Sequence, residues 1–161
     1  MWLGSVFDHI LGIIGVLLAF WSFSRIKKTK IALKQKENEL LYFIASSEFG
    51  AIATIATEAT NLMRRREWES VFRIVINLGN SLAMANGAWR HLLTDLEKDK
   101  LDVATGYVQS LVQSIPVGKQ ERQVTDEQIQ NMIELCQFVS VVTGPLAGRL
   151  KVAHMTARGE E

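Results

Sequence analysis

Residues Trp2–Phe23 read WLGSVFDHILGIIGVLLAFWSF, and this stretch sets the first part of the chain apart from the rest. A helix needs about 20 apolar residues to cross a hydrocarbon layer of about 30 Å, and these 22 residues are enough. Asp8 and His9 are its only ionisable residues. A cleaved secretory signal would need a positive start and a small-residue cleavage site, and the stretch has neither. The sequence therefore predicts an uncleaved transmembrane helix over residues 1–24.

Basic residues follow the apolar stretch, with no acidic residue between positions 24 and 36. The first of them are Arg25, Lys27, Lys28 and Lys30. Because segments rich in Lys and Arg stay in the cytoplasm, this membrane-flanking basic segment predicts a single-pass protein whose C-terminal domain is cytoplasmic. No glycine or proline interrupts residues 25–46, so we expect a basic juxtamembrane helix there, close to membrane lipid.

Small residues recur along one face of the expected membrane helix. Together with one acid they form the series Gly4, Asp8, Gly12, Gly15, Ala19 and Ser22, which spans an arc of about 80° at 100° per residue. Small side chains let helices approach closely in lipid, where apolar side chains alone give no reason to associate. Asp8 either lies at the outer headgroup level or faces a partner or water. In both cases the series predicts self-association, as a pore-lining or helix-packing face.

The composition of the whole chain is that of an ordinary globular protein. Apolar residues make up 48% and charged residues 22%, with a formal net charge of +1. Such a balance lacks the basic excess that nucleic-acid readers direct at phosphates. Cys136 is the single cysteine, which excludes an internal disulfide and a multi-thiolate metal site. Its place among apolar residues at helical spacing predicts a small buried side chain.

Apolar residues recur at helical spacing through residues 47–161, and no run alternates with period two for long enough to predict a sheet. We expect helices at about 52–63, 68–96, 101–115, 126–143 and 146–155. Gly79 and Gly87 predict a bend or close helix packing, and Thr125-Asp126-Glu127-Gln128 is a capping box. Gly144-Pro145 predicts a kink or break. The fold class is therefore all-α, with one transmembrane helix followed by a four- or five-helix bundle.

Chemistry-bearing motifs are few. The sequence has no glycine-rich phosphate loop and no histidine spacing suited to a metal. We therefore expect no cofactor, no metal and no small-molecule substrate. One constellation remains, Arg149 and His154, five positions apart near the C-terminal end of the bundle. Five residues place two side chains about 140° apart on an unbroken helix, so they would meet only across a second subunit or an unwound turn.

An Arg-x-x-x-x-His motif near the end of a small helical bundle resembles the HEPN superfamily of ribonucleases and their inactive relatives. In that superfamily the arginine and the histidine meet their symmetry mates across a dimer interface. The resemblance implies that His154 moves a proton at a ribose 2′-hydroxyl and that Arg149 stabilises the phosphate. The residue after the arginine is usually polar in active members, whereas here it is Leu150, which counts against catalysis.

The combination of one N-terminal membrane helix, a basic juxtamembrane helix and a short HEPN-like bundle is similar to a narrower group. These are the small membrane accessory proteins of type VI-B CRISPR systems, which target RNA. The resemblance implies a homo-oligomer of six or more subunits in the bacterial inner membrane. Such an oligomer would form a pore, enhance RNA-guided antiviral defence, and have an RNA-guided nuclease or its RNA as a further partner. The alternatives are a membrane-tethered ribonuclease acting across a dimer and a non-catalytic membrane adaptor.

Overall fold

The computed structural model describes the backbone of residues 2–116 and 124–159, and the side chains of 25–26, 29–116 and 124–156. The elements are α1 (Trp2–Arg64), α2 (Trp68–Trp89), a 3-10 turn η1 (Arg90–Leu92), α3 (Asp95–Ser114) and α4 (Asp126–Gly159). No strand occurs in the described part of the chain. The predicted all-helical fold class is therefore confirmed.

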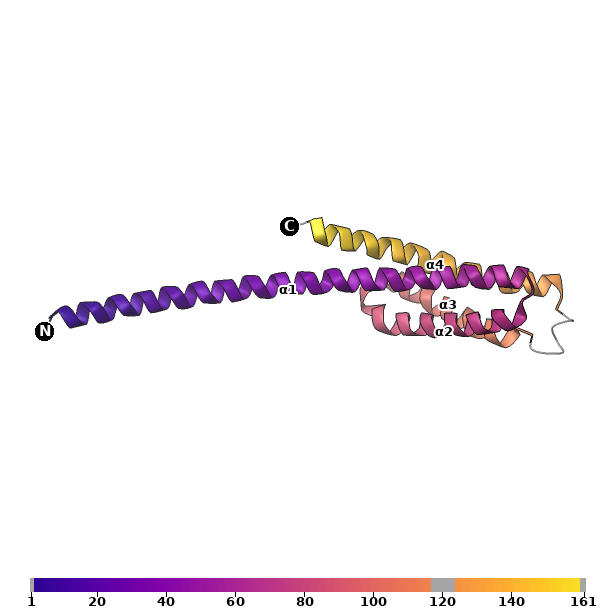
Figure 1. Cartoon of the computed structure of the whole chain (residues 1–161), viewed down its shortest axis with the longest axis horizontal. Helices are drawn as coiled ribbons and strands as arrows, with labels where there is room; N and C mark the ends of the chain where they lie inside the picture. Colours follow the sequence, from indigo (N-terminus) through magenta and orange to yellow (C-terminus); the bar gives the residue numbers. More distant parts are fainter. Residues whose placement is uncertain (1, 117–123, 160–161) are drawn as a thin grey trace. The chain divides into compact units, whose positions relative to one another are not determined.

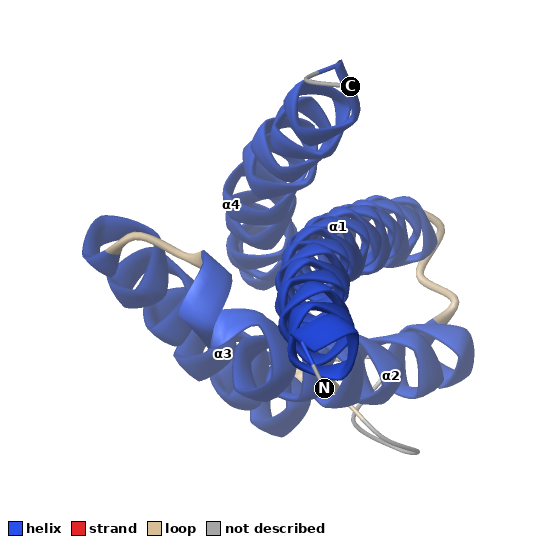
Figure 2. Ribbon diagram, turned by 90° about the vertical axis from the view of Figure 1, so that its left-hand side faces the viewer, coloured by secondary structure: helices blue, strands red, loops and turns tan. Residues whose placement is uncertain are grey.

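The chain divides into two compact units, residues 1–40 and residues 41–161. The division falls inside α1, a helix of 63 residues. The helices expected at 2–23, 25–46 and 52–63 are thus parts of one continuous element. In the second unit the last part of α1 lies beside α2 and α4, and α3 packs against α2 and α4 (Figures 1 and 2). This unit is therefore a four-helix bundle.

The predicted anchor lies within the first unit. Its backbone is helical from Trp2 onward, but its side chains, including the whole Gly4–Ser22 series, lie outside the described residues. Among the side chains that are described, one helical segment, Thr29–Arg64, is long and apolar enough to cross a membrane by length and composition. The second half of that segment belongs to the bundle, and its apolar residues form part of the core described next.

The core face of α1 repeats every three or four residues. It consists of Ala45, Phe49, Ile52, Ala56, Ala59 and Met63, all of which are buried. This spacing places the side chains on one stripe of a helix, where they pack against the other three helices. The facing residues of α2 are Trp68, Val71, Val75, Leu78, Leu82, Ala85 and Trp89. Most of the apolar positions expected from the helical spacing are confirmed as core or as partly buried against it, but Leu96, the last of the second series, is 65% exposed.

Helices α1 and α4 approach each other through small side chains. The Ser46 hydroxyl donates to the Ala147 carbonyl at 2.8 Å, and the Ser140 hydroxyl donates to the Ala53 carbonyl at 3.2 Å. A Cβ placed on Gly50 would lie 3.9 Å from the Ala147 Cβ. The residue numbers in these contacts rise along α1 as they fall along α4. The two helices are therefore antiparallel neighbours.

Gly79 lies where α2 packs against α3. A Cβ at this position would stand 3.3 Å from a methyl carbon of Val108, which is tighter than most real contacts. The sequence predicted either a bend or close helix packing at Gly79 and Gly87. At Gly79 the structure shows close packing. The helix continues unbroken through Gly79 and Gly87 to Trp89, seven residues short of the predicted end at 96. The remainder forms η1 and the start of a new helix.

The turn between α1 and α2 is a Schellman motif with an arginine at its left-handed position. The Glu67 N–H donates to the Leu62 carbonyl, and the Arg66 N–H donates to the Met63 carbonyl. Arg66 has φ of 59°, a region that glycine usually occupies because a Cβ crowds the backbone there. Its guanidinium also contacts Asp126 at the start of α4.

Replacing Arg66 is expected to reveal the strain of this turn. Arg66→Gly and Arg66→Ala both remove the contact with Asp126, but only glycine removes the Cβ. The glycine variant should therefore be more stable than the alanine variant by about 1 kcal/mol. Chemical denaturation of both variants measures this difference, and equal stabilities would contradict the left-handed assignment.

Both remaining long helices begin with a threonine cap. The predicted box at Thr125 is confirmed, since its hydroxyl accepts from the Gln128 N–H at 3.2 Å and its N–H donates to Gln128 Oε1 at 2.9 Å. A second box at Thr94 and Glu97, not predicted from the sequence, opens α3. Of the kink or break predicted at Gly144-Pro145, the break does not occur, because α4 continues through Pro145. Pro145 is exposed, as is Val141 four residues earlier, so the carbonyl that lost its donor lies at the solvent side.

Candidate functional site

Arg149 projects from α4 toward the start of α3. Its Nε donates to Glu97 Oε1 at 2.7 Å, and its Nη2 donates to Glu97 Oε2 at 3.0 Å. The same Nη2 also donates to the Leu92 carbonyl at 3.0 Å. The planar guanidinium therefore meets the carboxylate with two parallel hydrogen bonds, the strongest arrangement open to an arginine.

Glu97 is held from two sides. Its side chain is only 18% exposed, whereas that of Arg149 is 41% exposed. Burial acts to raise the pKa of Glu97, but hydrogen bonds from the Thr94 N–H and hydroxyl and the contact with Arg149 outweigh it, so the pKa is lowered. Glu97 consequently stays ionised at neutral pH, as cap of α3 and as counter-ion of Arg149.

His154 turns toward a different helix. Its ring lies 5.5 Å from the ring of Phe43 on α1, centroid to centroid, with the planes tilted by 50°. Because α4 is unbroken between positions 149 and 154, the two motif side chains are about 140° apart around its axis. Arg149 thus contacts α3 and His154 contacts α1, and the fold of one chain does not bring the pair together.

This arrangement limits what the motif can do chemically within one chain. Nε and Nη2 of Arg149 are engaged by Glu97 and the Leu92 carbonyl, so bidentate binding of a phosphate through these two nitrogens requires release of Glu97. Sequence reasoning found Arg149 and His154 but missed their partners Glu97 and Phe43. The Thr94-x-x-Glu97 spacing was a readable signal for a helix cap. Nothing in the sequence linked position 97 to position 149.

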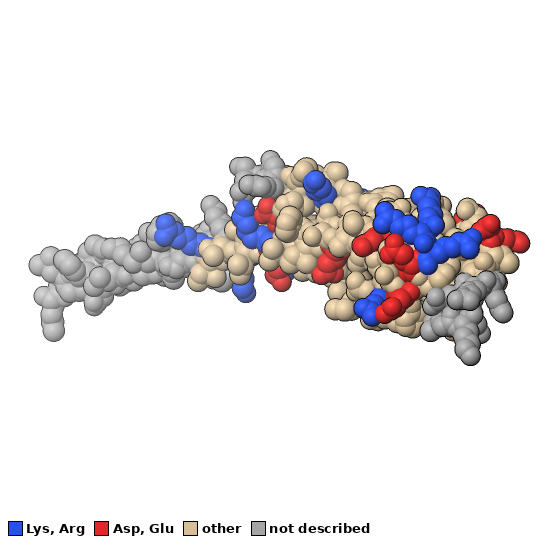
Figure 3. Space-filling view, turned by 45° about the vertical axis from the view of Figure 1, so that its right-hand side comes forward, with Lys and Arg blue, Asp and Glu red and all other residues tan. Residues whose placement is uncertain are grey.

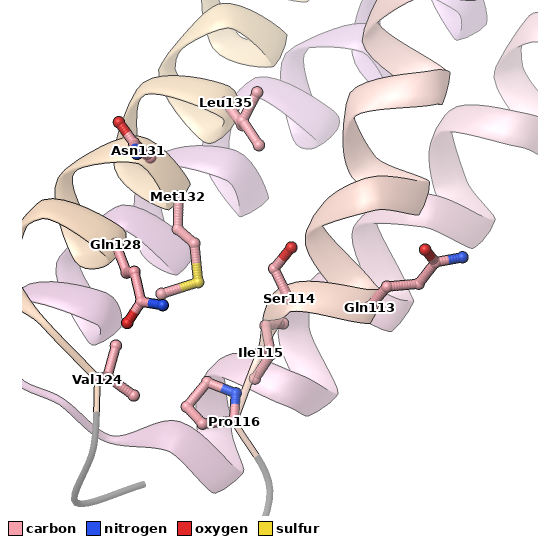
Figure 4. Close-up of a pocket in the computed structure, with 9 residues that line it drawn as sticks. All are labelled: Gln113, Ser114, Ile115, Pro116, Val124, Gln128, Asn131, Met132 and Leu135. Atoms are coloured by element: carbon pink, nitrogen blue, oxygen red, sulfur yellow. The ribbon is translucent and has the colours of Figure 1, made fainter. Parts of the chain in front are cut away.

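A cavity of about 430 Å³ lies where α3 ends and α4 begins (Figure 4). Its lining residues are Gln113, Ser114, Ile115, Pro116, Val124, Gln128, Asn131, Met132 and Leu135. None of these side chains is ionisable, so they offer amides and a hydroxyl but no acid, base or strong nucleophile. Across the described residues, no group of three or more His, Cys, Asp and Glu side chains is placed to hold a metal ion.

Cys136 is buried on α4, as its place in the apolar pattern predicted. Burial raises the pKa of its thiol to about 12. The thiolate is the reactive form, so the folded protein should hold this residue inert.

Thiol reagents are therefore expected to label folded protein at pH 8 at least about a hundredfold more slowly than an exposed cysteine. Maleimide labelling followed by mass spectrometry measures the rate, and unfolding in guanidinium chloride should restore fast labelling. Rapid modification of the folded chain would place Cys136 at the surface.

The surface charges of the bundle are mixed. On the face seen in Figure 3, acidic and basic side chains are interspersed. Arg90, for example, pairs with Asp102 through two hydrogen bonds of 2.8 and 2.9 Å. Of the membrane-flanking basic residues, Arg25 and Lys30 are exposed, and Lys27 and Lys28 lie outside the described side chains. The basic side chains that lie together at the right-hand end of the bundle in Figure 3 are bordered by acidic ones, unlike the uninterrupted basic surface that nucleic acids require.

No family model matches the sequence, and neither a curated protein nor a solved structure matches the chain. The HEPN resemblance accordingly rests on the helical architecture and on Arg149 and His154 alone.

Proposed function

We propose that this chain is a membrane-anchored, self-associating protein without enzymatic activity, which forms a pore in the bacterial inner membrane. In this proposal residues 1–24 span the membrane once, and the bundle lies in the cytoplasm as a divergent HEPN-like domain. Its role is that of an accessory that enhances RNA-guided antiviral defence by perturbing the membrane. It would do so as a ring of six or more copies.

The observation that carries the non-enzymatic part is that Arg149 and His154 each have a contact inside their own bundle, which a catalytic pair completed across a dimer would have to leave. The arginine is engaged by Glu97 on α3, and the histidine lies against Phe43 on α1. An acid–base mechanism needs a proton carrier within hydrogen-bond reach of the reacting group, with the phosphate held beside it. Residues that stabilise helix contacts within the bundle fit a scaffold better than a catalytic pair.

The self-associating part rests on the small-residue series from Gly4 to Ser22. In lipid, close backbone approach and interhelical hydrogen bonds are what drive helix association. Asp8 on the same face would be costly at membrane depth unless it met a partner or water. In a ring of such helices the small residues would let neighbouring helices approach closely, and Asp8 would face the water of the lumen.

The mass of the full-length protein, released from detergent in native mass spectrometry, tests the assembly. A closed ring of six or more subunits is expected, and Gly15→Leu should break it down because a bulky side chain separates the helices. Ile13→Leu, a change between large side chains away from the series, is the matched control. A monomeric wild-type protein, or an unchanged mass in Gly15→Leu, would overturn the proposed assembly.

Two activity measurements then separate pore from nuclease. The wild-type ring should conduct ions in planar lipid bilayers, and Asp8→Leu should alter that conductance by removing the charge from the lumen. Incubation with single-stranded RNA should leave the RNA intact. Cleavage that disappears in His154→Ala, together with a dimeric mass, would replace the proposal with the ribonuclease alternative.

A further inference from the structure

Two charge-free stretches lie next to each other in the bundle. Residues 74–89 (IVINLGNSLAMANGAW) and 103–116 (VATGYVQSLVQSIP) contain no Asp, Glu, Lys or Arg, in a chain where 22% of residues are charged. The first stretch covers most of α2, and the second runs from within α3 to just past its end. The two helices pack against each other where Gly79 meets Val108. The outer surface along this contact is therefore uncharged over several helical turns.

A groove of about 460 Å³ runs along this surface. We call it the amide groove, and its main exposed or half-buried lining residues are Ile76, Asn80, Ala83, Gln109, Val112 and Gln113. The side chains of Asn80, Gln109 and Gln113 make no hydrogen bond with any described residue. In Figure 4, Gln113 points away from the other side chains drawn around the neighbouring cavity. Three carboxamides thus offer free donors and acceptors along one uncharged groove.

Gly87, one turn beyond Ala83, is not explained by packing within the chain. It is exposed, and a Cβ there would meet nothing within 4 Å. A glycine inside a helix costs about 1 kcal/mol relative to alanine. Gly79 on the same helix differs, because its missing Cβ is needed for contact with Val108. The small residues Ala83 and Gly87 beside the amide groove therefore leave room for the backbone of another protein chain to approach α2.

We propose that the amide groove binds the same groove of a second copy of this chain, around a two-fold axis. A residue close to such an axis meets its own counterpart, so a charge at the centre of the groove would face the same charge. Carboxamides both donate and accept, and they can therefore pair with their own kind. The centres of protein–protein interfaces are also poor in charged residues. Nucleic acid or an anionic membrane surface would instead require Lys or Arg in the groove.

This inference rests on the proposed self-association but assigns it a second contact, in the bundle rather than in the anchor. An isologous contact closes after two copies. The bundle contact would therefore join chains in pairs, and the Gly4–Ser22 face would make a separate contact between anchors.

Cysteine cross-linking of the full-length protein tests the contact. Cys136 is buried, so an introduced exposed cysteine provides the reactive thiol. Asn80→Cys should give covalent dimers with a short bismaleimide at least about tenfold faster than Ser70→Cys, an exposed position in the charged first part of the same helix. Equal rates at the two positions would indicate random collision and overturn the proposal.

A charge placed in the groove provides the second test. In the Asn80→Cys background, Ala83→Arg should reduce cross-linking at least about tenfold, because two arginines would meet across the axis. Ser70→Arg adds the same charge outside the groove and should leave cross-linking unchanged. Far-UV circular dichroism checks that both variants fold. Undiminished cross-linking in folded Ala83→Arg would overturn the two-fold contact.

The two proposals fail in different ways. If Asn80→Cys cross-links as expected but the native mass shows only dimers, the groove contact is supported and the proposed ring is contradicted. If the ring forms and Gly15→Leu breaks it, while Asn80→Cys reacts no faster than Ser70→Cys, the anchor contact stands and the groove contact falls.

Discussion

Phe49→Ala is expected to lower the free energy of unfolding of the bundle by about 3–5 kcal/mol. Phe49 is fully buried on the core face of α1. Truncating it removes a large apolar surface from the core and leaves a cavity that the surrounding helices fill only in part. Denaturant titration of detergent-solubilised protein, followed by tryptophan fluorescence, measures the loss. Trp68 and Trp89 both lie in the same core and report its opening.

Met84→Ala is the matched control for this prediction. Met84 is 73% exposed on α2, so its truncation should change stability by less than about 0.5 kcal/mol. Phe49 lies in the segment Thr29–Arg64, which by length and composition alone qualifies as a membrane span. If Phe49→Ala proved as mild as Met84→Ala, Phe49 would face lipid or solvent, and the assignment of this part of α1 to the bundle core would be wrong.

Arg149→Ala is expected to destabilise the bundle by about 1–2 kcal/mol, more than a typical exposed ion pair, because the contact is bidentate. The variant leaves both Glu97 and the Leu92 carbonyl without their partner. Lys151→Ala removes a neighbouring exposed cation from the same helix and should have little effect. A loss no larger than that of Lys151→Ala would show that the contact contributes nothing to the fold.

Glu97→Gln separates the two roles of the carboxylate. Glutamine can still cap α3 beside Thr94 but carries no charge for Arg149. The losses in Arg149→Ala and Glu97→Gln should therefore not add in the double variant, with a coupling of about 1 kcal/mol. Because the pKa of Glu97 is lowered on folding, the pair stabilises the wild type above the unfolded pKa of Glu, near 4.5. That contribution is lost as pH falls through the lower folded pKa, and Arg149→Ala should weaken this pH dependence.

Local patterns predicted the helices well where one face is buried. The series through Ile52, Ala56, Ala59 and Met63 lies in the core because period-3.6 spacing leaves few alternatives. The cap at Thr125 could also be predicted from the sequence, because the donor and the acceptor of its hydrogen bond are only three residues apart. At Pro145 the break does not occur, because proline removes only one donor and an exposed carbonyl can turn to water instead.

The candidate site was less predictable, since its contacts join residues far apart in the chain. Arg149 and Glu97 are 52 residues apart, and His154 and Phe43 are separated by more than a hundred. Spacing alone gives the angle between Arg149 and His154 on a helix but not which helix each one meets. The amide groove likewise appears only once the charge-free stretches of α2 and α3 are placed side by side.

Glu97 links the start of one helix to the position of another. It accepts hydrogen bonds from Thr94 at the first turn of α3 and from Arg149 of α4. When the Glu97 carboxylate is released, the Thr94 cap and the Arg149 contact are lost together. The first turn of α3 should therefore unwind in the same local opening event in which α4 detaches near Arg149. Backbone amides in these two places, distant in sequence, should exchange their hydrogens with deuterium at a common rate. In Glu97→Ala that shared rate should rise in both.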